Sequence, residues 1–309
     1  MEKNAKILVL GARGLVGSAI VQELRAQGYH NIYQPGRTEV DLTDEVTVRW
    51  LFSVHRPEYV FFAAAKVGGI SDNASDKVGF LAENLRIELN VITAAAEYAV
   101  KKLLFVATSC IYPRDCPQPI REEYLMTGPL ERTTEAYSIA KIAGIRLCQY
   151  YREQLRHDFV VAVPCNIFGE RDNFNERTAH CLPGLMARIH RAKVTGAPEV
   201  VVWGDGTAQR EFLFAPDLAR ALILVMERYS SGEPINTGSG FELSIKDLAT
   251  VLAEKVIGYR GRLVFDTGEL TGTPRKVLES SKLRALGWRP EIPFIEALRA
   301  TYSWHALSL

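Results

Sequence analysis

Short apolar runs alternate with amphipathic segments through the first half of the chain. Each run is four to seven residues long, and the segments between them carry apolar residues at helical spacing. This alternation predicts buried parallel strands that are covered by helices. The predicted strands lie at residues 7–10, 31–34, 59–65, 103–107 and 159–163, and the clearest helices run from the turn after the first strand to about residue 28 and over residues 136–155.

The pattern changes after about residue 165. Short strands predicted at 200–203 and 262–265 are mixed with helices predicted at 245–256 and 294–304. We therefore expect a Rossmann-type doubly wound parallel sheet, of class α/β, with a smaller C-terminal α+β lobe over its carboxyl edge. The predicted domains are 1–165 for the dinucleotide and 166–309 mainly for the substrate, with some later segments free to return to the sheet. No repeat or flexible linker separates them, so the lobes should share an interface.

A glycine-rich turn lies between the first predicted strand and its helix. The sequence G-A-R-G-L-V-G at residues 11–17 has the spacing G-x-x-G-x-x-G. Glycines permit a tight turn and let the backbone approach a pyrophosphate, whose charge then lies at the helix N-terminus. Such a pattern alone often serves only chain reversal, but its strand–turn–helix context predicts a dinucleotide site. The cofactor contacts predicted from this turn are Gly11, Arg13, Gly14, Leu15, Val16 and Gly17.

The end of the second predicted strand bears on the choice of cofactor. An NAD enzyme commonly has an acidic residue there, whereas this chain reads Gln-Pro-Gly-Arg at 34–37. Arg13 and Arg37 suit a ribose 2′-phosphate, because guanidinium groups bind phosphate bidentately. The alternative is that both are solvated surface residues. We expect NADP(H), and we expect Asp41 to meet the adenine edge.

Tyr137 and Lys141 form a Tyr-x-x-x-Lys pair within the helix predicted at 136–155. Four residues of separation put both side chains on one helix face. A nearby ammonium should lower the pKa of the phenol, which can then exchange a proton with a sugar oxygen, and the lysine can also hold the nicotinamide ribose. Such pairs also occur by chance. This one follows a dinucleotide turn and a strand that ends at Thr108, which favours a catalytic interpretation.

In this order and spacing, the chain resembles the extended short-chain dehydrogenase/reductase family. Within that family it is similar to the GDP-L-fucose synthase branch, from the first strand to near the C-terminus. The strings that carry this similarity are A-A-A-K-V-G-G-I at 63–70, S-C-I-Y-P at 109–113, A-K-I-A-G-I at 140–145, D-N-F at 172–174, V-W-G at 202–204, R-E-F-L at 210–213 and G-T-P-R-K at 272–276.

The resemblance implies two reactions in one pocket: 3,5-epimerisation of GDP-4-keto-6-deoxy-D-mannose, then NADPH-dependent 4-reduction to GDP-L-fucose. Cys110 matches the family's base and His180 its acid. Tyr137 is expected to donate the proton during reduction, and Thr108 to hydrogen-bond the carbonyl oxygen. By themselves, a Cys after a buried strand is usually a core residue and a loop His is usually solvated. We also expect Ala64 to contact the cofactor.

The resemblance further implies a site for the GDP-sugar. Arg188 and Arg210 match residues that hold the diphosphate, with a planar partner for the base nearby. Cys181, beside His180, stands where an aliphatic residue is more usual, and the loop at 114–117 also differs. The predicted substrate contacts are Asn166, Leu185, Arg188, Trp203, Arg210 and Lys276.

Composition narrows the partners. Lys and Arg number 37 against 36 Asp and Glu, a net charge of +1, which argues against a surface that wraps nucleic acid. The five cysteines are scattered, so neither a disulfide framework nor a metal site is expected. The first apolar run is too short for a signal peptide, and no run reaches membrane-spanning length. We expect a cytoplasmic protein without a membrane partner.

Several alternatives remain open at this stage. The substrate could instead be a GDP-4-keto-3,6-dideoxy sugar or a GDP-4-keto heptose. An NAD-dependent nucleotide-sugar 4-epimerase or dehydratase is a second class, but a dehydratase should have Asp-Glu where Ser109 and Cys110 stand. A non-enzymatic nucleotide sensor is a third, although such proteins commonly lose the Tyr or the Lys. The family also implies a homodimer, paired through the helices predicted at 85–99 and 138–155.

Overall fold

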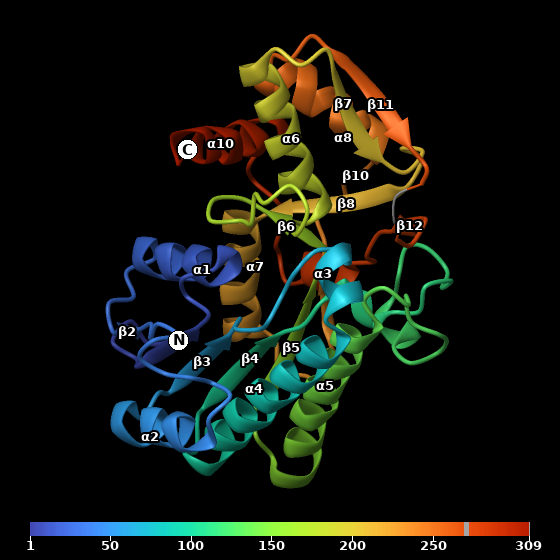
Figure 1. Ribbon diagram of the computed structural model, residues 1–309. Helices are drawn as coiled ribbons and strands as arrows, with labels where there is room; N and C mark the ends of the chain where they lie inside the picture. The colour runs from blue at the N-terminus through green and yellow to red at the C-terminus, as the bar shows by residue number, and fades with distance from the viewer. Residues whose placement is uncertain (269–271, 309) are drawn as a thin grey trace.

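In the computed structural model, which describes residues 1–268 and 272–308, six parallel strands form the central sheet (Figure 1). Their order across the sheet is β2-β1-β3-β4-β5-β9, so the chain winds outward in both directions from β1 and β3. This confirms the predicted Rossmann-type fold. The strands are β1 (Ile7–Leu10), β2 (Ile32–Tyr33), β3 (Tyr59–Phe62), β4 (Lys102–Val106), β5 (Phe159–Pro164) and β9 (Ile235–Thr237).

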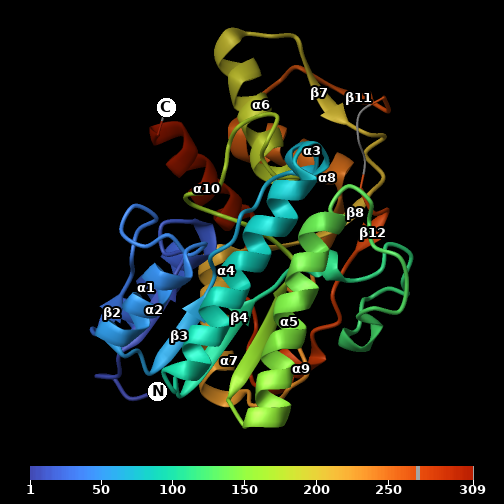
Figure 2. The same cartoon turned by 60° about the horizontal axis from the view of Figure 1, so that its bottom comes forward.

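Helices cover both faces of this sheet. On one face α1 (Leu15–Ala26) packs against α7 (Ala215–Arg228), and on the other α4 (Lys77–Glu97) lies between α2 (Glu45–His55) and α5 (Glu135–Leu155) (Figure 2). A short helix, α3 (Ile70–Ser75), precedes α4. The helix predicted from residue 85 begins eight residues earlier, because the Asp76 carboxylate accepts a hydrogen bond from Gly79 N and caps it.

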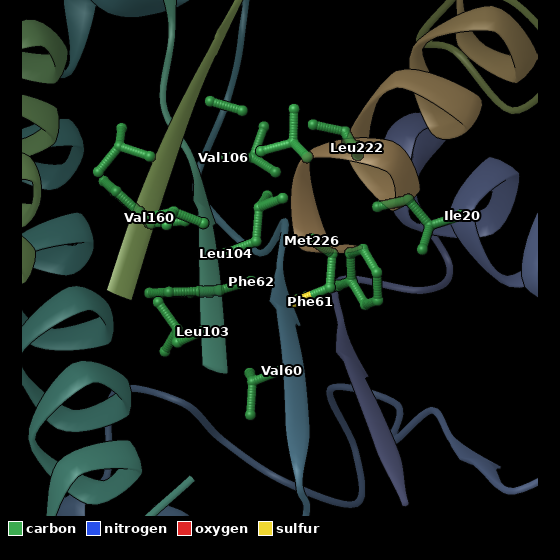
Figure 3. Close-up of a cluster of buried hydrophobic side chains, with 14 of the residues drawn as sticks. Ile20, Val60, Phe61, Phe62, Leu103, Leu104, Val106, Val160, Leu222 and Met226 are labelled. Carbon is green, nitrogen blue, oxygen red and sulfur yellow. The ribbon is translucent and has the colours of Figure 1, made fainter. Parts of the chain in front are cut away.

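The strands are buried on both sides, which explains why they read as continuous apolar runs. Side chains from β3, β4 and β5 meet α1 and α7 in the main hydrophobic core (Figure 3). This core fixes the sheet, and the loops at its carboxyl edge are therefore held in place. Its members include Ile20, Val60, Phe61, Phe62, Leu103, Leu104, Val106, Val160, Leu222 and Met226.

The second lobe lies over the carboxyl edge of the sheet (Figure 1). It has its own hydrophobic core, a small sheet of β10-β8-β12 with β6 beside β8, and a separate pair of β7 and β11. The helix predicted at 245–256 is α8 continued by a π-helical turn, η3. The elements are β6 (Asn166–Phe168), α6 (Cys181–Thr195), β7 (Glu199–Trp203), β8 (Gln209–Phe214), β10 (Glu242–Ser244), α8 (Ile245–Val251), η3 (Leu252–Ile257), β11 (Arg262–Asp266), β12 (Arg275–Lys276) and α10 (Phe294–Leu307).

The chain crosses between the lobes more than once. Beyond residue 165, α7 and β9 return to the central sheet, and α9 (Ser281–Ala285) packs beside β9. The buried Asn236 amide ties these crossings together, because its Nδ2 donates to the carbonyl oxygens of Ile120 and Glu279. The second lobe is thus attached to the sheet at several points. Within the described residues, no helix is both long enough and apolar enough to cross a membrane.

Candidate active site

The glycine turn after β1 is packed too closely to hold larger residues. Gly11 has φ +85°, and a Cβ there would lie 2.8 Å from Ala64 N. A Cβ on Gly17 would lie 2.2 Å from Gly11 O. The glycines therefore let the turn press against the end of β3 on one side and against α1 on the other. Ala64 lies at this contact, beside the predicted cofactor site.

The N-terminus of α1 is open to an anion. Gly14 caps the helix without a side chain, and the first turn carries no acidic residue. Its free N–H groups and the positive end of the helix dipole can thus bind a pyrophosphate. The turn and the helix end fit a dinucleotide.

Two arginines flank the loop at the end of β2. The Arg13 guanidinium packs over Gly36, where a Cβ would lie 2.4 Å from its Cζ. Arg37 lies in solvent, with its side chain 84% exposed and its Nη2 3.2 Å from Glu83 Oε1. Both can turn to a 2′-phosphate beside this loop. The Asp41 carboxylate accepts from Thr43 N and Oγ1, at 2.9 and 2.8 Å, so its contact with adenine stays a prediction.

Tyr137 and Lys141 lie on the inner side of α5. The Lys141 ammonium is buried, 3.2 Å from Glu88 Oε1 on α4 and 3.4 Å from the carbonyl oxygen of Val106 at the end of β4. Tyr137 lies one turn nearer the helix N-terminus, half-buried, with its ring centre 5.9 Å from Lys141 Nζ. The pair therefore faces the carboxyl edge of the sheet, where the glycine turn also lies.

One expectation about this pair is wrong for the protein without ligand. The pKa of Tyr137 is raised, not lowered, because burial disfavours the phenolate and the charges of Cys110 and Glu88 oppose it. Lys141 does not offset these effects, since its ammonium is paired with Glu88. Tyr137 is thus held as a neutral phenol, which is the form that donates a proton.

Cys110 lies in η1 (Ser109–Ile111), the single turn that follows β4. Its backbone N donates to Thr108 Oγ1 at 3.3 Å, and its Sγ accepts from Lys276 Nζ at 3.4 Å. Burial alone would raise the pKa of the thiol. The Lys276 charge, with hydrogen bonds from Thr108, Lys276 and Thr134, outweighs burial and lowers it. Lys276, which we had assigned to the substrate, contacts the predicted base.

His180 is the residue before α6, and its side chain is exposed. The loop that leads to it is anchored on the 63–70 string, because Gly69 N donates to the carbonyl oxygen of Thr178 at 2.8 Å. Surrounding protein atoms and the nearby Lys276 charge lower the pKa of the imidazole. Lys276 therefore acts electrostatically on both the predicted base and the predicted acid.

The predicted diphosphate and base contacts gather around the start of α6. The Arg188 guanidinium stacks over the Trp203 ring, with Cζ 4.7 Å from the ring centre. Burial raises the pKa of the Cys181 thiol, although the nearby charges of Arg210 and then Arg188 favour the thiolate. The contacts of Arg188, Trp203 and Arg210 with the sugar nucleotide stay predictions.

Two further substrate assignments lie in the second lobe. Leu185 on α6 is fully buried in the core of that lobe, and its contact with the substrate stays a prediction. The Asn166 Nδ2 donates to the carbonyl oxygen of Glu211 at 2.8 Å and helps to join β6 to β8. Its contact with the sugar nucleotide stays a prediction.

Two residues of the site were missed. Thr134, whose hydrogen bond contributes to the lowered pKa of Cys110, precedes Tyr137 by three residues, and helical spacing would have placed it on the same face. Glu88 interrupts the apolar, sheet-facing positions of α4, and a lone acid at such a position was the available signal. Its partner could not be read from the pattern, because α4 and α5 are far apart in the sequence.

Comparisons with known proteins agree with this geometry. Residues 7–238 match the NAD dependent epimerase/dehydratase family. A putative GDP-L-fucose synthase 2 from Arabidopsis thaliana is 50% identical over 305 residues, which cover 99% of this chain and 93% of that protein. The structure of a GDP-6-OMe-4-keto-L-xylo-heptose reductase from C. jejuni has a TM-score of 0.94 at 30% identity and covers 100% of this chain and 99% of that one. A GDP-L-fucose synthetase from Naegleria fowleri bound to NADP has a TM-score of 0.92 at 30% identity, with 100% and 96% covered.

Proposed function

The chain belongs to the NAD dependent epimerase/dehydratase family, and from that premise we propose that it converts GDP-4-keto-6-deoxy-D-mannose to GDP-L-fucose by 3,5-epimerisation and 4-reduction. The relatives make it an NADP-dependent oxidoreductase and epimerase. The alternative of a dehydratase lacks support, since Ser109 and Cys110 follow the strand-end Thr108 where an Asp-Glu pair would be needed.

One observation carries the proposal. Cys110 Sγ lies 3.4 Å from Lys276 Nζ, one turn of chain beyond Thr108 and beside the Tyr137–Lys141 helix. Ser138 Oγ on that helix donates to Cys110 O at 2.9 Å, which fixes the two parts against each other. A reductase alone needs the Tyr–Lys pair. An activated thiol next to it adds the base that epimerisation requires.

Epimerisation uses Cys110 and His180. The thiolate removes a proton from a carbon beside the 4-ketone, and the Thr108 hydroxyl donates a hydrogen bond to the ketone oxygen, where negative charge develops. His180, in its protonated form, returns a proton on the opposite face of the sugar. Lys276 favours the thiolate and disfavours the extra charge on His180, so the imidazolium gives up its proton readily.

Reduction uses Tyr137 and Lys141. The neutral Tyr137 phenol donates a proton to the carbonyl oxygen at C4, where NADPH, when bound, would supply the hydride. The glycine turn and the α1 N-terminus would hold the pyrophosphate, and Arg13 with Arg37 would hold the 2′-phosphate. Lys141, which reaches the end of β4, would orient the ribose next to the nicotinamide.

The GDP part of the substrate binds at the start of α6. Arg188 and Arg210 bind the diphosphate, and Trp203 offers a flat face to the guanine. The Arg188 guanidinium already lies on the Trp203 ring, which orients it. The sugar then points toward Lys276, between Cys110 and His180.

The experiment mixes the purified protein with GDP-4-keto-6-deoxy-D-mannose and NADPH, follows the loss of reduced nicotinamide, and identifies the product by NMR. We expect NADPH oxidation with formation of GDP-L-fucose. Formation of the unepimerised GDP-deoxy sugar would refute the roles of Cys110 and His180 but keep the reductase. Absence of turnover would refute the substrate.

A GDP-4-keto heptose is the second candidate substrate. It is favoured by the close structural likeness to the heptose reductase from C. jejuni. The higher sequence identity to the plant protein favours the deoxymannose. Ratios of kcat/KM for the two GDP-sugars, measured with the same preparation, decide between them.

We also propose that the protein forms a homodimer through α4 and α5. These helices lie side by side on the outside of the sheet (Figure 2), and both carry exposed apolar side chains: Leu89 at 56%, Ile139 at 44% and Tyr150 at 51%. Such side chains are typical of a covered surface. We expect a dimer in sedimentation at micromolar concentration and a monomer for Leu89→Glu. A wild-type monomer would contradict the proposal.

A further inference from the structure

Glu88 is a buried acid that the mechanism above does not use. It lies in the middle of α4, 2% exposed, on the side of the helix that faces the sheet and α5. Apart from Asn84, the neighbouring inward positions on α4 are apolar, among them Ile87, Val91 and Ile92. An unpartnered carboxylate at such a position would be costly, so its surroundings indicate why it is there.

The Glu88 carboxylate pairs with Lys141, the lysine of the Tyr-x-x-x-Lys pair. Glu88 Oε1 lies 3.2 Å from Lys141 Nζ, and Lys141 is the only cation that pairs with it in the described part of the chain. The second oxygen points at α5, where a Cβ on Gly144 would lie 2.7 Å from it. Glycine at position 144 therefore makes room for this carboxylate, one turn beyond Lys141 on the same helix.

Stability alone does not explain the pair. Removing two charges from water is costly, and a buried ion pair is often no better for stability than apolar residues of the same volume. Lys141 also lies over the Phe105 ring, 4.5 Å from its centre, in surroundings where an aliphatic side chain would pack well. The pair is thus better explained by what Lys141 does for its neighbour Tyr137.

We infer that Glu88 is a positioning residue for the reduction: it holds Lys141 at the end of β4, and its own charge opposes the phenolate of Tyr137, which therefore stays a phenol that can donate a proton. This inference rests on the proposed function for the direction of proton transfer. It assigns Glu88 no contact with the substrate or the cofactor.

The charged groups around this pair agree with the inference. Tyr137 is acted on by Cys110 from η1 and by Glu88 from α4, and both oppose the phenolate after burial has already raised its pKa. Lys141 is acted on by Glu88 and, within α5, by Cys148, while burial lowers its pKa. Burial raises the pKa of Glu88 itself to about 7, against the Lys141 charge, so its carboxylate is charged at alkaline pH. Without Glu88, Tyr137 would lose one of the charges that oppose its phenolate.

The test compares Glu88→Gln, Glu88→Asp and the matched control Glu97→Gln, which removes an exposed carboxylate from the same helix. The readout is the pH profile of kcat for NADPH oxidation with the GDP-sugar. Reduction stops as pH rises through the pKa of Tyr137. In Glu88→Gln this alkaline limb should move to lower pH by about one unit, because the Glu88 charge no longer opposes the phenolate.

Glu88→Asp keeps the negative charge but moves it farther from Lys141 and Tyr137. The alkaline limb of its pH profile should therefore lie between those of the wild type and Glu88→Gln. Glu97→Gln should match the wild type. An alkaline limb at the wild-type position in Glu88→Gln, with only kcat lowered, would overturn the inference and leave Glu88 a structural role. If Glu88→Gln does not fold, the same comparison is made with Glu88→Asp, and an unmoved limb there overturns it.

A second readout needs no turnover. Tyrosinate absorbance is titrated for the wild type and for Glu88→Gln, each against the same protein with Tyr137→Phe. We expect the Tyr137 transition at lower pH in Glu88→Gln than in the wild type. If the wild type turns over no GDP-sugar but this transition moves, the proposed function fails while the role of Glu88 in holding the phenol stands. An unmoved transition overturns that role whatever the activity.

Discussion

The two halves of the site each contain a lysine, and the two lysines have opposite surroundings. Lys141 lies in the first lobe, 1% exposed, with its ammonium against the Glu88 carboxylate. Lys276 comes from the second lobe and pairs with no carboxylate among residues 1–268 and 272–308, but its ammonium lies against the Cys110 thiol. The first is paired with a buried carboxylate, and the second is not.

This difference gives neighbouring groups opposite acid–base properties. Beside the Lys141–Glu88 pair, burial and then the charges of Cys110 and Glu88 raise the pKa of Tyr137, so the phenol keeps its proton for the reduction. Beside Lys276, the pKa of Cys110 is lowered, so the thiol can lose its proton and act as a base. One pocket can therefore hold an acid and a base at the same pH.

Replacing Cys110 should separate the two halves most strongly. We expect Cys110→Ser to lose epimerisation by about a thousandfold, because an unactivated hydroxyl is a far weaker base than a thiolate. Reduction of the unepimerised sugar should continue, and NMR of the product identifies it. Cys116→Ser, in a loop outside the site, is the matched control. Equal losses of both reactions in Cys110→Ser would show that the halves are not separable.

Removing the charge of Lys276 should have the next largest effect. Lys276→Gln should slow epimerisation by about a hundredfold at neutral pH, because the pKa of the thiol rises and less thiolate is present. Because more of the thiol is ionised at higher pH, the rate of epimerisation by Lys276→Gln should recover as pH increases. The pH profile of deuterium incorporation into the sugar measures this shift, and a profile that keeps its wild-type position would mean that Lys276 acts only in binding.

Adding a methyl group at the glycine turn should weaken both halves through the cofactor. Gly11→Ala places a Cβ at φ +85°, 2.8 Å from Ala64 N, and the turn must move away from the pyrophosphate. We expect the Kd for NADPH to rise by about tenfold, as measured by calorimetry. Gly196→Ala, which also has a positive φ but no atom within 4 Å of the added Cβ, is the control for backbone strain alone.

The smallest effect should come from a helix cap outside the site. The Asp44 carboxylate accepts from Val46 N at 2.9 Å and caps α2. Asp44→Ala should lower the free energy of unfolding by about 1 kcal/mol in urea titration and change neither reaction. If activity fell as well, small losses of stability would affect catalysis, and the larger effects above would need correction for them.

The fold could be predicted in most of its parts, because its strands are continuous apolar runs with turns between them. The turn at 11–17 gave the cofactor site from local spacing alone, and Tyr137 and Lys141 followed from the period of one helix. Local patterns did not predict where later segments of the chain return to the central sheet. The return of β9 to the sheet was only a possibility, since three apolar residues carry little signal.

The electrostatics of the site could not be predicted in the same way. Glu88 and Lys141 are 53 positions apart, and Cys110 and Lys276 are 166 apart, so no spacing rule connects them. The wrong expectation for the pKa of Tyr137 came from counting the nearby lysine without its acid.

The central claim is that proton transfer at carbon and proton donation to oxygen are run by separate groups. It is tested most directly by Tyr137→Phe with GDP-4-keto-6-deoxy-D-mannose and NADPH in D2O, following deuterium at the sugar carbons by NMR and NADPH by absorbance in one sample. The account predicts deuterium incorporation near the wild-type rate while NADPH oxidation falls by at least about a hundredfold. A proportional loss of both would contradict it, because the phenol would then serve both reactions.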